Sequence, residues 1–367
     1  MYYVTLPDVN PDSTEVGEYG RRLVFYLAME EYVSRHLDEI LMDRPTQNGS
    51  KEAFFIWQVS PTVIFGRNQV MEAEVNLPYC RENGINLFRR KSGGGCVYSD
   101  LGNIMLSCVS DSTDVAFTFD RFLRRLALCL RRLGLNAEPS GRNDVLVDGK
   151  KVSGNAFYLM QESSVVHGTL LFDSDFNALS KAITPSKAKI TSKGVASVRQ
   201  HVANVRDFLV GSDDVNVRKY ADIREFKSFL VDFFCEQEKI VLTPEQVGEI
   251  EEIEKGYLDP AFLEGRRKDY GLEFRGKPEN VGEVAVMIDM KGDKIDAVHL
   301  DGDYFLVSEL GECAPSELDS MLSSRLRGCP LSRVEVEKAL EGLQLSKIVR
   351  NLDEKKLSDL IFNTDNN

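Results

Sequence analysis

The stretch DVLVDGKKVSG, residues 144–154, is the part of this sequence that decides the fold. Asp148 and Gly149 lie between two β-prone flanks, and both residue types accept the positive φ angles of a two-residue hairpin turn. We therefore predict a β-hairpin with Lys151 just inside the return strand. Asp144 and Lys151 would then lie on adjacent strands at one end of a sheet, where a carboxylate and an ammonium can meet.

Apolar runs on both sides of this hairpin predict further strands. AFFIWQV, TVIFG, INLF and NIMLSCV precede the hairpin, and SVVHGTLLF follows it. The first two are predicted as strands around a turn at Ser60-Pro61. Apolar residues at three- and four-residue spacing predict helices over residues 23–40, 119–135, 176–183, 217–237 and 244–258. The first part of the chain is therefore a mixture of strands and helices around a sheet.

The chain of 367 residues is long enough for two domains at roughly 150 residues each. Residues 265–278 are charged and contain glycine, a composition typical of a linker. We predict a first domain over residues 1–264, a linker over 265–275 and a second domain over 276–367. In the second domain, EVAVMIDM and KIDAVHLD flank a turn at 291–293, FLVSEL adds a strand, and three helical segments follow.

Charge and composition exclude several classes of function. The net charge is −13 and the pI near 5.0, which argues against binding to nucleic acid or to anionic lipid. No run of about eighteen apolar residues predicts a membrane span, and the first residues show no basic signal region, so we expect a cytoplasmic protein. Seven scattered cysteines without a C-x-x-C pair, and four separated histidines, predict reduced thiols and no zinc site.

The segment RRKSGGG, residues 89–95, is a candidate anion site. A strand delivers Arg89, Arg90 and Lys91, and three glycines then allow the backbone amides to approach a ligand closely. A bulge or a mobile hairpin loop requires the same residue, so the glycines alone leave both interpretations open. The sequence contains no G-x-x-x-x-G-K-[ST] motif, which excludes a P-loop.

Three other features could carry chemistry or serve the fold alone. Lys151 and Asp144 could form a simple surface ion pair, or Lys151 could stabilise developing negative charge while Asp144 helps to hold Mg²⁺. His167 lies in an apolar strand, as either a hydrogen-bonded core histidine or a ligand-binding one. Trp57 could belong to the core or line a pocket.

In these segments the sequence resembles the lipoate-protein ligases. The motifs that carry the resemblance are LAMEE (27–31), FGRNQ (65–69), RRKSGGGCVYSDLGN (89–103), SGRNDVLV (140–147), KVSGNAF (151–157), HGTLL (167–171) and KGVASVR (193–199). The resemblance covers the whole chain, because the region after about 275 looks like the family's small accessory domain. It implies an α+β fold: a large mixed or antiparallel sheet of the biotin/lipoate ligase type, with a small α+β domain behind it.

The resemblance also implies a reaction in two halves. Lipoic acid and ATP with Mg²⁺ give lipoyl-adenylate and pyrophosphate, and the lipoyl group then passes to a lysine of a lipoyl carrier domain. Lys151 matches the catalytic lysine between the acyl carboxyl and the α-phosphate, and Asp144 is a candidate Mg²⁺ ligand. The residues implied to bind substrate or adenylate are Trp57, Arg90, Ser92, Gly93, Gly94, Gly95, Val97, Asn103, Asn143, Ser153, Gly154, His167, Thr169 and Lys193. The polar loop over 182–199 matches a segment that closes over the adenylate.

The implied partners are the apo lipoyl domains of 2-oxoacid dehydrogenase complexes and the glycine cleavage H protein. Two positions depart from the family pattern: many relatives have alanine where this chain has Cys96, and some have histidine where it has Ser99. Cys96 could be a nucleophile or a small space-filling residue. Two other functions therefore stay open: a transferase that uses a preactivated lipoyl or octanoyl donor, in one version through Cys96, and a non-catalytic adaptor that only binds lipoyl domains.

Overall fold

An eight-stranded mixed sheet forms the centre of the first unit. The computed structural model describes residues 1–7, 21–46, 49–141, 143–160, 162–183, 201–235, 239–264, 271–307 and 315–362. The strand order is β11-β1-β2-β6-β10-β9-β8-β7. β1 runs parallel to both of its neighbours, and the other pairs are antiparallel. The strands are β1 (Tyr2–Thr5), β2 (Glu52–Trp57), β6 (Asn103–Ser110), β7 (Ala137–Ser140), β8 (Asp144–Val147), β9 (Lys150–Met160), β10 (Ser163–Leu171) and β11 (Ile240–Val241).

The hairpin predicted from the sequence is confirmed. Asp148 and Gly149 have φ angles of 48° and 75°, as a turn with two left-handed residues requires, and they join β8 to β9. The register shifts between Val145 and Leu146, so that Leu146 faces Lys151 but Asp144 faces Gly154. Lys151 lies diagonally across from Asp144, and the extra residue of this bulge brings Gly154 opposite Asp144.

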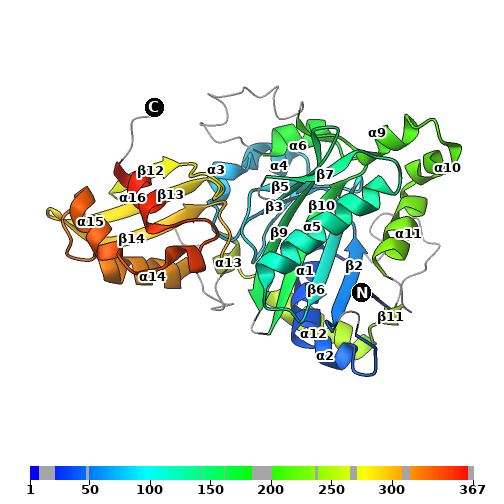
Figure 1. The fold of residues 1–367 in the computed structure, drawn as a ribbon, viewed down its shortest axis with the longest axis horizontal. Helices are drawn as coiled ribbons and strands as arrows, with labels where there is room; N and C mark the ends of the chain where they lie inside the picture. Colours follow the sequence, from blue (N-terminus) through cyan, green and yellow to red (C-terminus); the bar gives the residue numbers. More distant parts are fainter. Residues whose placement is uncertain are drawn as a thin grey trace.

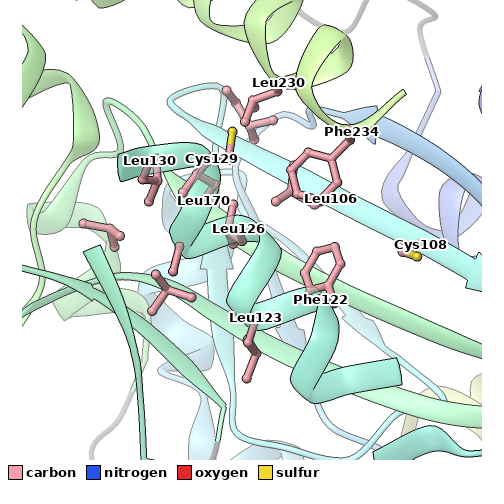
Figure 2. Packing of buried hydrophobic residues seen from close by; sticks show 14 of the residues in the cluster. Leu106, Cys108, Phe122, Leu123, Leu126, Cys129, Leu130, Leu170, Leu230 and Phe234 are labelled. Atoms are coloured by element: carbon pink, nitrogen blue, oxygen red, sulfur yellow. The ribbon is translucent and has the colours of Figure 1, made fainter. Parts of the chain in front are cut away.

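Helices cover both faces of the large sheet, which is why its central strands are apolar on both sides. In β6, Ile104, Leu106 and Cys108 pack under α5 (Val115–Arg131) and α11 (Ile223–Phe234). Figure 2 shows Leu106 and Cys108 among the core residues of these two helices, and Figure 1 shows the helices on the sheet. Met105 and Val109 alternate with them and pack with α1 (Leu23–Arg35) and α12 (Pro244–Tyr257) on the opposite face. Because side chains alternate along a strand, Ser107 faces α1 together with Met105 and Val109. His167, the register partner of Ser107 on β10, faces the same side.

A small three-stranded sheet, ordered β4-β3-β5, holds the glycine-rich segment. Its strands are β3 (Thr62–Phe65), β4 (Asn86–Arg89) and β5 (Val97–Ser99). The prediction that the segments around Ser60-Pro61 are both strands is confirmed, but β2 and β3 belong to different sheets instead of pairing with each other. The glycines Gly93–Gly95 connect β4 to β5 within this sheet.

Short helices complete the first unit. They are α2 (Leu37–Ile40), α3 (Met71–Glu74), α4 (Leu77–Glu82), α6 (Phe176–Ala182), α9 (Val205–Val210), α10 (Val215–Arg218), η1 (Lys219–Ala221) and α13 (Pro260–Glu264). Among the helices that the structure describes, none is both long and apolar enough to cross a bilayer.

The C-terminal unit is a three-stranded antiparallel sheet packed against helices, and it lies beside the large sheet in Figure 1. It contains β12 (Leu272–Gly276), β13 (Val284–Lys291), β14 (Lys294–Gly302), α14 (Pro315–Leu326), α15 (Arg333–Leu340), η2 (Leu345–Lys347) and α16 (Glu354–Phe362). The predicted hairpin and three helices are confirmed. Of the predicted strand over 305–310, Leu306 makes a single bridge to Val349, and residues 308–310 lie outside the described part of the chain.

One aromatic side chain joins the two units. Phe305 of the C-terminal unit is fully buried in the core under α5, where its ring stacks on Phe157 at 5.0 Å. Arg350 lies over the rings of Phe119 and Phe157, and its amide donates a hydrogen bond to the Phe305 carbonyl. The C-terminal unit is therefore docked on the first unit through the core itself.

Candidate functional site

Two adjoining cavities lie where the hairpin, the glycine-rich segment and the C-terminal unit meet. The larger has a volume of about 690 Å³ and is lined from the first unit and from the Lys277–Asn280 loop, Gly282 and Asp303 of the C-terminal unit. The smaller, of about 100 Å³, reaches toward Met105 and His167. Seven residues border both cavities: Gly95, Cys96, Val97, Asn143, Lys151, Gly154 and Thr169.

Lys151 lies at the junction of the two cavities and is ion-paired with Asp144. Its Nζ atom is 2.7 Å from Asp144 Oδ1, and the two side chains are 36% and 32% exposed. The Ala203 amide donates to the Lys151 carbonyl at 2.9 Å, which fixes the backbone at the bulge. The Lys151 ammonium is thus paired with Asp144, its backbone is held in place by a hydrogen bond, and its side chain remains accessible from the cavities.

Gly154 makes room for the lysine side chain. A Cβ atom at residue 154 would lie 2.8 Å from Lys151 Nζ and 2.9 Å from its Cε. Thr169, opposite Gly154 in the register, exchanges hydrogen bonds with the Gly154 backbone. A side chain at residue 154 would therefore displace the end of Lys151 from its present position beside Asp144.

Asn143 is held by a second asparagine, Asn155. The Asn143 side chain donates to the Asn155 carbonyl at 2.8 Å, and the Asn155 side chain and amide both donate to the Asn143 carbonyl. Asn155 itself is almost completely buried. Asn143 therefore borders the cavities in a fixed orientation, and Asn155 is a supporting residue that the sequence analysis did not identify.

Arg90 is buried and directed at the backbone of its own loop. Its guanidinium donates to the carbonyls of Ile64, Gly93 and Gly95 and to Ser92 Oγ. Burial lowers the pKa of Arg90 to about 10. Because these contacts occupy most of its donors, Arg90 shapes the loop from inside, although it also borders the smaller cavity.

The glycines of the loop are required by close packing. A Cβ atom on Gly93 would lie 2.2 Å from the Tyr304 carbonyl oxygen, and Gly94, with φ 88°, lies under the Phe305 ring. The alternative of a merely mobile loop is thus not what the structure shows. Both the C-terminal unit and Arg90 contact the loop.

The other predicted site residues are distributed unevenly. Val97 and Thr169 border both cavities, and His167 borders the smaller one, with its Nε2 atom 2.7 Å from Ser92 Oγ. Trp57, Ser92, Gly93, Asn103 and Ser153 do not border these two cavities. Trp57 stacks on Tyr26 in the core and donates to Ser107 Oγ. Lys193, like most of the predicted loop over 182–199, lies outside the described residues.

Cys96 and Ser99 have different surroundings. Burial raises the pKa of the Cys96 thiol well above its usual value, the opposite of what an activated nucleophile requires. Ser99 is buried and accepts a hydrogen bond from Asn103 Nδ2 at 2.9 Å. Cys96 therefore fits a space-filling role at the cavity wall.

Asp144 is the carboxylate beside Lys151 at the wall of the larger cavity, and it is a candidate ligand for Mg²⁺. Within the described ranges, no group of three or more His, Cys, Asp and Glu side chains converges as metal ligands do. Mg²⁺ in nucleotide sites is usually held by one or two carboxylates together with the phosphates. Asp144, partly exposed at the cavity wall, fits that arrangement.

A large mixed sheet with a partly exposed lysine between two adjoining cavities is an arrangement suited to an enzyme that acts on small molecules. Residues 30–234 match the family model described as the lipoyl protein ligase A/B catalytic domain, and residues 270–361 match the bacterial lipoate protein ligase C-terminus. The chain is 33% identical to lipoate-protein ligase LplJ of Bacillus subtilis, over 92% of this chain and 96% of that one. It belongs to the lipoate-protein ligases.

Solved structures agree with this assignment. A P. falciparum LipL1 structure in complex with lipoate superposes with a TM-score of 0.66 at 20% identity, covering 98% of this chain and 97% of that one, which confirms the predicted fold. A bipartite lipoate protein ligase of Thermoplasma acidophilum, studied with its E2 lipoyl domain, gives 0.54 at 28% identity, with 74% and 98% covered. A lipoate-protein ligase A bound with ATP gives 0.51 at 28% identity, with 66% and 94% covered.

Proposed function

We propose that the junction at Lys151 is where this ligase joins lipoate to ATP. The larger cavity, between the two units, would hold the nucleotide, and the smaller one, extending toward Met105 and His167, would receive the acyl end. The observation that carries the proposal is that Lys151 borders both cavities with its ammonium accessible. The related structures bound to lipoate and to ATP support these two substrates.

The first half-reaction would proceed by in-line displacement at the α-phosphorus. A lipoate carboxylate oxygen forms the new P–O bond, and pyrophosphate leaves as the bond to the β-phosphate oxygen breaks. Two oxyanions repel each other as they approach, and the Lys151 ammonium between them lowers that barrier. Asp144 would hold Mg²⁺ shared with the phosphates, and the bound ion would supply further charge neutralisation.

The second half-reaction would transfer the acyl group. The amine of an acceptor lysine attacks the lipoyl carbonyl, AMP leaves with the electron pair of the C–O bond, and the amine loses a proton. The proposed acceptors are lipoyl domains of 2-oxoacid dehydrogenase complexes and the glycine cleavage H protein, in the cytoplasm. The archaeal relative studied with its E2 lipoyl domain supports the first kind of acceptor.

The direct test combines the purified chain with lipoate, MgATP and either acceptor. We expect ATP-dependent pyrophosphate release and modification of one acceptor lysine, measured by mass spectrometry. A parallel reaction without ATP but with lipoyl-adenylate isolates the transfer step. Transfer without any pyrophosphate release from lipoate and ATP would contradict activation and leave a transferase, and failure of both would leave an adaptor.

The cysteine version of a transferase has its own test. Cys96→Ser keeps the volume of the side chain and removes the thiol. We expect unchanged acyl transfer, because the surroundings of the thiol raise its pKa and disfavour the thiolate. Abolished transfer would instead identify Cys96 as the nucleophile.

A further inference from the structure

A continuous chain of buried hydrogen bonds connects the core tryptophan to the glycine-rich loop, and Glu30 lies at its centre. Trp57 Nε1 donates to Ser107 Oγ at 2.9 Å, and Ser107 Oγ donates to Glu30 Oε1 at 2.6 Å. On the other side, Glu30 Oε2 is 2.8 Å from His167 Nδ1. His167 Nε2 then meets Ser92 Oγ, which accepts from Arg90 Nε at 2.9 Å.

The fold explains why these groups meet. Ser107 and His167 are register partners on β6 and β10, and both face α1. Helix α1 is buried on nearly its whole circumference, so the carboxylate of Glu30, with no exposed area, needs hydrogen-bond donors inside the protein. Ser107, His167 and the Tyr158 hydroxyl supply them.

The two ends of this chain have fixed roles, because a guanidinium only donates and a carboxylate only accepts. Arg90 therefore donates to Ser92, and Glu30 accepts from His167 Nδ1–H. In the neutral Nδ1–H tautomer of His167, Ser92 donates to Nε2, and the hydrogen bonds run in one direction from Arg90 to Glu30. The orientation of the imidazole and of the serine hydroxyl therefore depends on Glu30.

Arg90 connects this chain of hydrogen bonds to the backbone of the glycine-rich loop. It binds the carbonyls of Gly93 and Gly95, and in a planar trans peptide the next N–H points the opposite way. The amides of Gly94 and Cys96 are therefore directed away from the guanidinium. Neither amide donates a hydrogen bond to another residue of the described chain, and both residues border the smaller cavity.

We propose that Glu30 is a positioning residue for adenylate formation, acting through His167, Ser92 and Arg90 on the amides of the glycine-rich loop. The proposal rests on the ligase function proposed above and adds to it. Glu30 does not border either cavity; it acts at a distance by setting the donors that hold the loop. An oriented array of amides stabilises oxyanions without reorganisation during the reaction.

Glu30→Gln is the first test. An amide offers one acceptor oxygen where the carboxylate offers two, so it cannot accept from both Ser107 and His167. We expect the rate of pyrophosphate release at saturating lipoate and ATP to fall about tenfold or more, as is typical for a lost hydrogen bond to a charged group. The matched control is Glu254→Gln, another buried carboxylate, which pairs with Arg22 away from the loop.

Both variants are assayed well below their melting temperatures, and active enzyme is counted by the lipoyl-adenylate bound in a single turnover. The control is expected to stay within about twofold of the parent rate. Equal rates for the two variants per active enzyme would overturn the proposal. An inactive parent enzyme would instead overturn the ligase function, so the two failures are distinguishable.

A double-mutant cycle separates positioning from a general loss of packing. Ser92→Ala interrupts the chain between His167 and Arg90 and leaves Glu30 in place. If Glu30 acts through Ser92, the double variant Glu30→Gln/Ser92→Ala will lose no more rate than the worse single variant. Losses that multiply, with the double variant about a hundredfold below the parent, would show independent roles and overturn the proposal.

Discussion

Two cations border the smaller cavity, and the molecule holds them in opposite ways. Lys151 is 36% exposed, has a carboxylate partner at 2.7 Å and opens toward both cavities. Arg90 is 5% exposed and directs its donors at three backbone carbonyls and one hydroxyl. Lys151 therefore has donors free for a substrate, whereas most of the donors of Arg90 are already used by the protein.

Replacing Lys151 tests the accessible side of this comparison and has the largest expected effect. Lys151→Ala removes the ammonium that would stabilise the meeting oxyanions, and we expect pyrophosphate release to slow by about a hundredfold or more. The unfolding temperature should hardly change, because a partly exposed ion pair contributes little to stability. Lys150→Ala, one residue earlier and exposed, is the matched control with an expected change below about twofold.

Replacing Arg90 tests the buried side. Arg90→Lys keeps the charge but cannot reproduce the planar set of donors, so some of the carbonyls lose their partner. We expect the free energy of unfolding in urea to fall by about 2–3 kcal/mol and the rate to fall about tenfold. Arg124→Lys, on the exposed side of α5, should change neither quantity. A slower rate with unchanged stability would place Arg90 among the groups that contact substrate.

A smaller effect is expected from the glycine beside the lysine. Gly154→Ala places a methyl group within 3 Å of the Lys151 side-chain end, which must move, while the backbone conformation of residue 154 suits alanine. We expect about a tenfold lower rate with little change in stability, since a displaced catalytic group is costly. In a Lys151→Ala background the same substitution should have no further effect on rate, and an additional loss there would mean that Gly154 acts in some other way.

The sequence predicted the parts of the site that local chemistry determines. The Asp148-Gly149 turn sets the register of β8 and β9, so the proximity of Asp144 and Lys151 could be derived from a few residues and is confirmed. Glu30 was not singled out, because a glutamate in a helix is usually exposed and nothing local shows that α1 is buried all round. Lys277 and Asp303 of the C-terminal unit line part of the larger cavity. Their position there depends on how the two units pack together, and no local sequence pattern encodes that packing.

His299 in the C-terminal unit is a third cation to compare, and its charge is lost when the pH rises. We expect its replacement to change stability and not the reaction rate. His299 lies between Asp319, on α14, and Asp301, whose Oδ1 atom is 2.9 Å from Nε2. Burial alone would lower the pKa of His299, but the two carboxylates outweigh it and raise the pKa to about 9. The raised pKa means that the protonated form stabilises the fold.

This contribution is fully present below the unfolded pKa of about 6.5 and is lost as the pH rises through about 9. We expect His299→Gln to be less stable than the parent by roughly 1–3 kcal/mol at pH 6, with the difference shrinking toward zero near pH 10. Urea unfolding of both proteins across this range measures it, and comparing the pair cancels the titration of other groups. A difference that stays constant with pH would mean that His299 contributes packing and not charge.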